Sequence, residues 1–300
     1  MSDGVERNTR TIEGSVVTDF TDRMSYGGYL QLDTLLSAQH PLSRPEHHDE
    51  LLFIIQHQTT ELWLKLVLHE LAAACRFLRE DHLAPALKCI ARVKHIQKTL
   101  TEQWSVLATL TPAEYVQFRG VLGNASGFQS AQYRAVEFTL GNKNAAMLRV
   151  FEADAGAYEL VRDALEAPSL YDEFLRLLAR TGYPIPQAVL DRDVTKAWEY
   201  SPELVPVFAA IYDDPQTHWA AYETCEELVD LEDDFQLWRF RHLKTVERII
   251  GLKKGTGGSS GVPFLRRALE LTFFPELYAV RTELREPSGV PDPTPAPTDG

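Results

Sequence analysis

The sequence predicts an all-α fold, with one large helical domain, long core helices and no significant sheet. Three observations support this prediction. Apolar residues recur every three or four positions between good helix caps, no segment alternates apolar and polar residues for long enough to make a convincing strand, and no internal repeat divides the chain. The 300 residues are 44% hydrophobic and 24% charged, which is ordinary for a globular protein with a sizeable core.

The ends of the chain differ from its middle. Residues 1–20 show no apolar periodicity, and residues 286–300 contain five prolines. Both segments are expected to be disordered, because neither can bury enough apolar surface to order itself. The folded domain is therefore expected to comprise residues 21–285.

Helix caps and periodicity predict the elements in order. A helix is expected around Tyr29–Ser37, and the capping box Ser43-Arg-Pro-Glu46 predicts a long helix that runs from there towards Arg79. A second capping box, Thr111-Pro-Ala-Glu114, has proline at N1 and predicts a short helix that ends near Gly120 or Gly123. Further helices are expected around Gln129–Leu140, Leu170–Ala179 and Phe264–Leu271.

The last long helix is expected from about Thr217 to Ile250. Its apolar face is defined by Leu231, Phe235, Trp238, His242, Val246 and Ile249, which follow the helical spacing. Glycine at position 251, or the glycines after Lys254, should end it.

Charge and cysteine usage exclude several classes of function. The net charge of −13 would repel a phosphate backbone, so no nucleic-acid partner is expected. The cysteines Cys75, Cys89 and Cys225 are widely spaced and are expected to be buried small hydrophobes. No apolar run reaches the roughly 18 residues of a transmembrane helix, and residues 1–19 do not resemble a signal peptide. No membrane association and a cytoplasmic location are therefore expected.

Two histidines stand out on the predicted helices. His242 occupies a position where the period requires an apolar residue, but such a histidine is more often a hydrogen-bonded core residue than a metal ligand. Spacing alone therefore favours a structural role for it. His57 lies in the polar stretch Gln56–Glu61 of an otherwise apolar helix, one turn after Phe53. Such a stretch lines either solvent or a polar pocket.

Two further features have both a functional and an ordinary interpretation. Tyr115 and Arg119 lie four residues apart, so they can converge on a carboxylate, although a surface arginine paired with Glu114 is the commoner case. The glycine-rich segment 253–261 lacks the Gly-Lys-Ser/Thr ending of a phosphate loop. It is either a linker or a loop that closes over a ligand and presents Thr256.

Six segments together resemble the tryptophan 2,3-dioxygenases, haem enzymes that open the indole ring of L-tryptophan. They keep the family's order and span about Tyr26 to Arg281. The segments are Tyr26-Gly-Gly-Tyr-Leu30, His47-His-Asp-Glu-Leu-Leu-Phe-Ile-Ile-Gln-His-Gln58, Glu61-Leu-Trp-Leu-Lys65, Ser126-Gly-Phe-Gln-Ser130, Phe235-Gln-Leu-Trp-Arg-Phe-Arg-His242 and Lys254-Gly-Thr-Gly-Gly-Ser-Ser-Gly261.

This resemblance implies that residues 21–285 form a haem-binding catalytic domain, whose long helices enclose one non-covalent haem b per subunit, active as Fe(II). His242 would be the axial iron ligand, reversing the prediction from spacing. Ser126 would lie beside the haem, with Tyr133 one helical stretch further along.

The resemblance also implies roles on the substrate side. Phe53, Ile54, Ile55, Gln56 and His57 would line the substrate, with His57 as the catalytic residue that accepts a hydrogen bond from the indole N–H. Tyr115 and Arg119 would hold the substrate carboxylate, and Thr256 would help to hold the ammonium group. The family is homotetrameric, with an N-terminal segment covering a neighbour's active site. Tyr26 and Tyr29 are therefore expected to act in trans.

The implied reaction uses O2 to cleave the indole C2–C3 bond of L-tryptophan and gives N-formyl-L-kynurenine, the first step of tryptophan degradation by the kynurenine route. Whether His57 also removes the indole proton stays open. The alternatives are a dioxygenase for a substituted indole, a non-catalytic haem-based gas-binding or sensor protein, and a helical scaffold with no cofactor. A gas sensor needs no site for a carboxylate and an amine, so the set Tyr115, Arg119 and Thr256 argues against it.

Overall fold

The fold is known from a computed structural model that describes residues 8–284. Within this range the chain forms fourteen α-helices and four short 3-10 helices and has no strand, so the predicted all-α fold is confirmed. The chain divides into two compact units, the first ending at Pro41 and the second beginning at Leu42. The predicted disordered tail, residues 286–300, lies outside the described residues.

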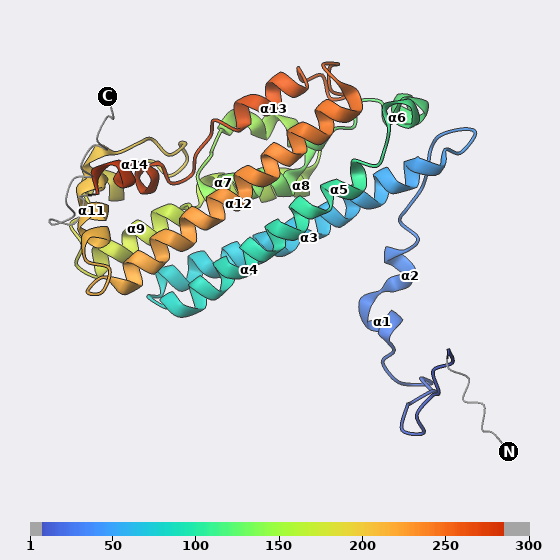
Figure 1. The fold of residues 1–300 in the computed structure, drawn as a ribbon, viewed down its shortest axis with the longest axis horizontal. Helices are drawn as coiled ribbons and strands as arrows, with labels where there is room; N and C mark the ends of the chain where they lie inside the picture. Colours follow the sequence, from blue (N-terminus) through green and yellow to red (C-terminus); the bar gives the residue numbers. More distant parts are fainter. Residues whose placement is uncertain (1–7, 285–300) are drawn as a thin grey trace, which may run out of the picture. The chain divides into compact units, whose positions relative to one another are not determined.

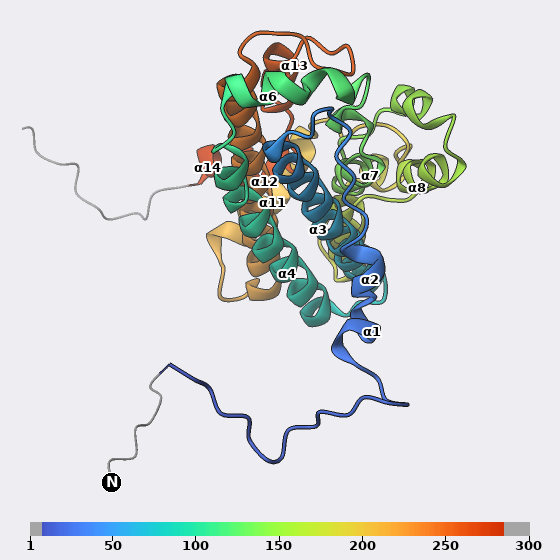
Figure 2. The ribbon, with the colours of Figure 1, turned by 90° about the vertical axis from the view of Figure 1, so that its right-hand side faces the viewer.

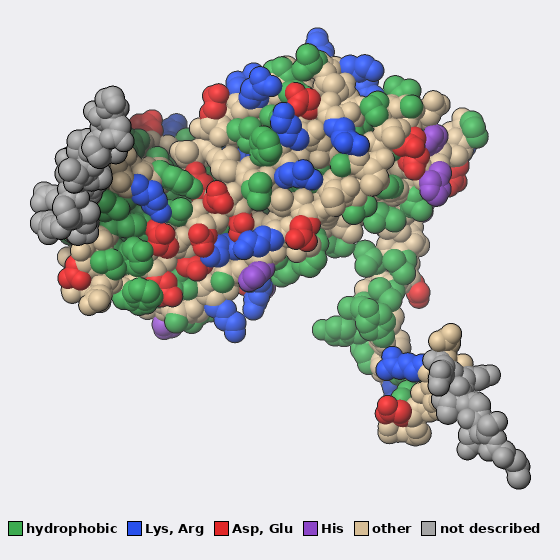
Figure 3. Space-filling view, viewed as in Figure 1, with side chains coloured by type: hydrophobic (Ala, Val, Ile, Leu, Met, Phe, Trp, Pro, Cys, Tyr) green, Lys and Arg blue, Asp and Glu red, His purple; other side chains and the backbone are tan. Residues whose placement is uncertain are grey.

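The unit before Leu42 contains two short helices in its described part, α1 (Tyr26–Leu30) and α2 (Leu32–Leu35). The single helix predicted around Tyr29–Ser37 is therefore wrong. Gln31 adopts a left-handed conformation (φ 52°), and its Nε2 donates to the carbonyl oxygen of Gly28 at 2.6 Å. Apolar side chains cover much of this unit's surface (Figure 3), and those exposed by 70% or more include Ile12, Met24, Tyr26, Tyr29 and Leu36.

Three long helices form the frame of the second unit. They are α3 (His48–Arg79), α4 (Leu83–Glu102) and α12 (Trp219–Ile250), and α4 packs along both of the other two (Figure 1). Their shared core contains fully buried side chains such as Leu71, Ile90 and Leu228. Burial of each such side chain stabilises the fold by about 1.5–3 kcal/mol relative to exposure, so these contacts fix the spacing between the helices.

The predicted start of the first long helix is wrong. Helix α3 begins at His48, because Ser43 is held in a turn instead of capping a helix. Its Oγ accepts from the amide of His47 at 2.9 Å, while its own amide donates to Glu50 Oε2 at 2.9 Å. The amide of Leu42 donates to Glu50 Oε1 at 2.7 Å. The Glu50 carboxylate thus organises the chain before the helix.

Helix α4 was not among the predicted elements, although Ile90, Val93 and Leu100 follow a helical period. Its N-cap, His82, makes no side-chain capping bond, and Pro85 stands in its first turn, where proline is tolerated. The usual start signals are therefore missing. By contrast, α12 agrees with its predicted bounds within two residues, and Gly251 (φ 61°) ends it.

Shorter helices cover the two ends of this frame. Helices α6 and α13 lie near one end and α11 and α14 near the other (Figures 1 and 2). The capping box predicted for α6 is confirmed, since the Glu114 amide donates to Thr111 Oγ1 at 3.3 Å and the Thr111 amide to Glu114 Oε2 at 2.7 Å. The remaining elements are α5 (Trp104–Leu107), α6 (Pro112–Phe118), η1 (Arg119–Leu122), η2 (Gly127–Gln129), α7 (Ala131–Leu140), η3 (Ala145–Phe151), α8 (Ala155–Glu166), α9 (Leu170–Arg180), α10 (Gln187–Leu190), η4 (Pro202–Leu204), α11 (Val205–Asp213), α13 (Val262–Ala268) and α14 (Pro275–Glu283).

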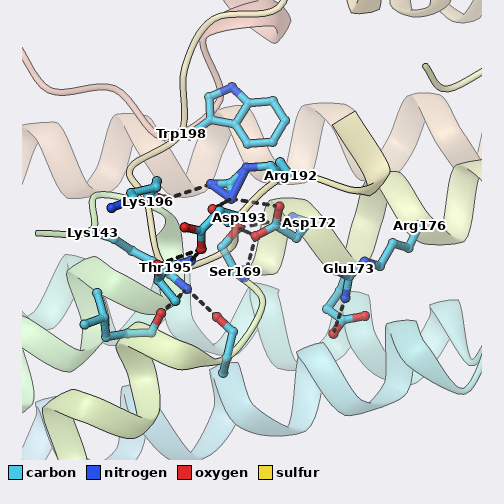
Figure 4. A network of polar contacts seen from close by, with 12 residues as sticks. Lys143, Ser169, Asp172, Glu173, Arg176, Arg192, Asp193, Thr195, Lys196 and Trp198 are labelled. Atoms are coloured by element: carbon cyan, nitrogen blue, oxygen red, sulfur yellow. Dashed lines mark hydrogen bonds and ion pairs between the residues drawn. The ribbon is translucent and has the colours of Figure 1, made fainter. Parts of the chain in front are cut away.

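Polar contacts join the segment after α7 to the end of α8, and the loop after α10 to α9 (Figure 4). Lys143 Nζ donates to the carbonyl oxygens of Leu165, at 2.9 Å, and Ala167. Ser169 Oγ donates to Asp172 at 2.7 Å, and Arg192 lies 3.5 Å from the same carboxylate. Burial lowers the pKa of Lys143 to about 8, because removal from water disfavours the charged ammonium.

Two other predictions concern composition. Cys75, Cys89 and Cys225 are all buried and unpaired, as predicted. Over residues 8–284, no helix has both the length and the apolar character that crossing a membrane requires.

Candidate active site

Helix α3 carries His57 in a defined hydrogen-bonding state. Its Nδ1 lies 2.7 Å from the carbonyl oxygen of Phe53. Because a carbonyl can only accept, Nδ1 must carry the hydrogen, and Nε2 of the neutral ring is then an acceptor. Burial lowers the pKa of His57, opposed by this hydrogen bond and by the charge of Glu61. The imidazole is therefore neutral near pH 7.

An aromatic cluster joins α3 to α6. The ring of Phe53 lies 4.1 Å from that of His57, 5.8 Å from Tyr115 and 5.7 Å from Phe118. These distances join centroids and are typical of packed aromatic pairs. The cluster forms an apolar wall beside the His57 ring.

The other predicted residues of this stretch have different environments. Ile55 is 44% exposed and Ile54 is partly buried. Ile55 lies two positions from both Phe53 and His57 and so does not share their face of the helix, whereas Ile54 lies three positions from His57 and borders that face. Gln56 is buried, and its Nε2 has no hydrogen-bond partner among the described residues.

The end of α6 supplies hydrogen-bond donors. Burial raises the pKa of Tyr115, with Arg119 opposing the shift, so the phenol stays protonated. Arg119 Nη2 donates to the carbonyl oxygen of Lys254 at 2.7 Å. Its Nε is buried without a partner in the described part of the chain. The guanidinium therefore keeps donor capacity for a ligand.

The glycine-rich loop contacts the segment after η1. Thr256 Oγ1 donates to the carbonyl oxygen of Ala125. Gly257 lies against Ser126 so closely that a Cβ at position 257 would be 2.6 Å from the Ser126 Cβ. Ser126 itself caps η2, since its Oγ accepts from the amide of Phe128 at 3.3 Å. Arg119, Ser126 and Thr256 are thus brought together through this loop.

His242 has an aromatic environment. Its ring is stacked on Trp104, with centroids 4.8 Å apart and planes 10° apart, and lies 5.4 Å from Trp238. Within residues 8–284, neither ring nitrogen of His242 has a hydrogen-bond partner. This environment gives no support to the hydrogen-bonded core role that spacing favoured.

Burial, with a smaller contribution from His57, lowers the pKa of His242 to about 4. The ring is thus neutral at pH 7. A neutral imidazole with an unbonded nitrogen between apolar walls suits the axial ligand of a haem iron. The residues present therefore fit such a group.

Trp104 was not predicted to belong to the site. It comes from α5, so no spacing along α12 could connect it with His242. Tyr133 packs behind Trp238 with centroids 5.3 Å apart, and its hydroxyl donates to Glu137 at 2.8 Å. Tyr26 and Tyr29 belong to the unit before Leu42, where they are 76% and 75% exposed.

Comparisons with known proteins agree over most of the chain. The model of the family described as Tryptophan 2,3-dioxygenase matches residues 13–163 and 205–284. A protein of that name from Arthrobacter sp. (strain FB24) is 71% identical over 280 residues, covering 93% of this chain and 99% of the relative. Another from Kineococcus radiotolerans is 70% identical over 284 residues, covering 95% and 99%. A third, from Xanthomonas campestris pv. campestris, is 58% identical over 292 residues, covering 96% and 98%. The chain therefore belongs to the tryptophan 2,3-dioxygenase family, whose members depend on haem.

Proposed function

We propose that this chain is a haem-dependent dioxygenase that uses O2 to cleave the indole C2–C3 bond of L-tryptophan and releases N-formyl-L-kynurenine. The observation that carries the proposal is the match between the hydrogen-bonding groups of the site and those of the substrate. Tryptophan offers a carboxylate that accepts and two nitrogen groups that donate, the ammonium group and the indole N–H.

The donors of the site suit the carboxylate. Arg119 keeps its Nε free, and the protonated hydroxyl of Tyr115 lies one helical turn away. Hydrogen bonds from a guanidinium to a carboxylate are charge-assisted and contribute about 1.5–3 kcal/mol each. These two residues would therefore bind the carboxylate and fix one end of the substrate.

The acceptors suit the two N–H groups. The single hydrogen of Thr256 Oγ1 is already donated to Ala125, so its lone pairs remain to accept from the ammonium. His57 likewise donates from Nδ1 to Phe53 and keeps Nε2 to accept from the indole N–H. Phe53 would hold the ring plane, and exclusion of water by the loop would favour productive orientation.

Haem b, held without a covalent link and one per subunit, would bind through its iron to His242, with Ser126 beside it. It would supply the Fe(II) that reacts with dioxygen. The protein's own contribution is then to hold the indole at a fixed orientation. A neutral His57 can also receive the indole proton, although the hydrogen bond alone accounts for its placement.

We further propose a homotetramer in which the unit before Leu42 completes a neighbour's site, with Tyr26 and Tyr29 near the substrate. The exposed apolar residues of that unit support this, because such surface is normally covered by a partner. Leu51, Ile55 and Leu62 give α3 an exposed apolar stripe, with exposures of 42%, 44% and 49%.

Residues 21–285 would form the catalytic domain. The three free thiols suit the reducing cytoplasm.

The proposed reaction is tested by product identification. The haem-loaded protein is reduced without oxygen and mixed with L-tryptophan and ¹⁸O2, and the product is analysed by mass spectrometry. We expect N-formylkynurenine with two ¹⁸O atoms. His242→Ala is the control and should lose haem-dependent turnover. If the protein binds haem but forms no product, a haem-based gas sensor is favoured. If it turns over a substituted indole but not L-tryptophan, a dioxygenase for that substituted indole is favoured.

A further inference from the structure

The imidazole of His242 is enclosed by two indole rings. Trp104 is 5% exposed, and its ring lies parallel to the imidazole, whereas Trp238 touches the same imidazole at an interplanar angle of 41°. The two tryptophans also contact each other, with centroids 5.8 Å apart. Trp238 is one turn from His242 on the same helix, so Trp104 is the ring contact among residues 8–284 that reaches the histidine from another element.

The usual means of orienting a metal-binding histidine is missing from the described residues. Such a histidine ordinarily donates its second ring N–H to a carboxylate or a backbone carbonyl, and this bond fixes the rotation of the ring. The structure offers neither group to His242. The stacked ring of Trp104 is then the ring contact that can restrain rotation of the imidazole from outside α12.

Trp104 is itself anchored to the helix that carries His57. The preceding residue, Gln103, donates from Nε2 to Thr60 Oγ1 at 2.7 Å and accepts from Thr59 Oγ1 at 3.4 Å. Thr60 in turn donates to the carbonyl oxygen of Gln56 at 2.8 Å. These hydrogen bonds connect the residue before Trp104 to α3 close to His57.

We propose that Trp104 is a positioning residue, whose indole face, anchored to α3 through Gln103, fixes the plane in which His242 presents its nitrogen to the haem iron. Trp104 acts through His242 and touches neither substrate nor iron. The inference rests on the proposed function only for the identity of the group that His242 binds. The restraint on the ring is a property of the chain itself.

The experiment compares Trp104→Leu, which removes the stacked face, with Trp104→Phe, which keeps an aromatic face. Trp198→Leu is the matched control, because Trp198 packs on Tyr171 with centroids 4.7 Å apart and is bonded to Glu276, away from His242. Gln103→Leu keeps the Trp104 indole but removes the hydrogen bonds of Gln103 to Thr59 and Thr60. Should Trp104→Leu fail to fold, Gln103→Leu and Trp104→Phe still separate anchoring from stacking.

The first measurement uses the full chain before haem is added. The ring signal of His242, assigned by its loss in His242→Ala, is followed by ¹³C NMR. In Trp104→Leu we expect the His242 signal to lose the ring-current shift caused by Trp104 and to broaden. Gln103→Leu should show part of this change. Trp104→Phe and Trp198→Leu should show neither effect. A His242 signal of unchanged width in Trp104→Leu would overturn the restraint.

The second measurement uses the haem-loaded protein and does not depend on turnover. Resonance Raman spectroscopy should show a broadened iron–histidine band in Trp104→Leu and a wild-type band in Trp104→Phe. Loss of the stack should speed haem transfer to apomyoglobin about two- to tenfold. An unchanged band and transfer rate would refute the positioning role. If the NMR result is as expected but haem does not bind through His242, the proposed function fails while the restraint on the ring stands.

Discussion

Two side chains of the candidate site have already given their hydrogen to the main chain. His57 donates to Phe53 and Thr256 donates to Ala125, so both face a ligand as acceptors. Arg119 is the opposite case, because it has donors to spare. At the scale of the residue, specificity therefore depends on which side-chain hydrogens are already donated to main-chain carbonyl groups.

Replacing Arg119 should weaken substrate binding more than turnover. We expect Arg119→Leu to raise KM for L-tryptophan about 10- to 100-fold, because charge-assisted bonds to the carboxylate are lost. Steady-state kinetics measure this, with Arg266→Leu as the control, since Arg266 is exposed on α13. An unchanged KM would exclude Arg119 from carboxylate binding.

The role of His57 can be isolated with a substrate that lacks the indole hydrogen. We expect His57→Phe to lower kcat/KM for L-tryptophan about tenfold, the value of one hydrogen bond. The same substitution should change kcat/KM for 1-methyl-L-tryptophan less than twofold, because that substrate has no N–H to donate. Equal losses for both substrates would contradict an acceptor role.

Helical spacing located the two histidines, and only the family resemblance assigned a different role to each. Periodicity indicated that His242 lies on a buried face, and a structural role followed from that alone. In the structure, the aromatic environment of His242 agrees with a ligand role, and it depends on Trp104 from a distant element. Contacts between elements leave no periodic signal within either one.

At the scale of the element, the glycine-rich loop is shaped by close contact with Ser126. Gly251, Gly258 and Gly261 have positive φ values of 61°, 84° and 70°, which suit glycine, whereas Gly257 is required by space. Capping boxes predicted α6 correctly and α3 incorrectly, because the Glu50 carboxylate competes for the amides near Ser43. Such a competitor lies outside the four-residue motif.

A side chain at position 257 should push the loop away from the site. We expect Gly257→Ala to raise KM about tenfold, since overpacking costs about 1–3 kcal/mol. The double variant with Ser126→Gly removes the Cβ that the new methyl group meets and should restore KM. Gly127→Ala is the control, because it has open space around it. If KM stays raised in the double variant, contact with Ser126 is not the cause of the increase.

The polar network around Lys143 should make stability depend on pH. The pKa of this residue is about 8 in the folded chain and near 10.5 when unfolded, so the folded state releases its proton first. Raising the pH from 8 to 10.5 therefore favours the folded state, by about 3 kcal/mol at most. The check is urea unfolding of the wild type and Lys143→Met across this range. Parallel pH profiles would contradict the prediction.

At the scale of the whole molecule, the two units have different surfaces. The second unit carries acidic and basic side chains close together on the face drawn in Figure 3, which suits a protein of net charge −13 in water. The first unit exposes many apolar side chains. Sequence composition did not reveal this contrast, because apolar residues without periodicity gave no sign of a surface that needs a partner.

Removal of residues 1–41 should disrupt the proposed assembly. We expect sedimentation to show smaller species and KM to rise, whereas removal of residues 1–7 alone should change neither. A mixing experiment tests action in trans. Subunits without residues 1–41 are combined with full-length Arg119→Leu subunits, and activity should recover in mixed tetramers. No recovery despite co-assembly would indicate that each subunit completes its own site.

The carbonyl groups of Phe53 and Ala125 have a consequence for protein engineering. Because they belong to the main chain, no substitution at positions 53 or 125 removes them, and libraries that vary the surrounding side chains leave the acceptor character of His57 and Thr256 in place. A variant intended for a substrate with an acceptor in place of the indole N–H must replace His57 itself. The selectivity of this site is therefore encoded partly in atoms that every amino acid shares.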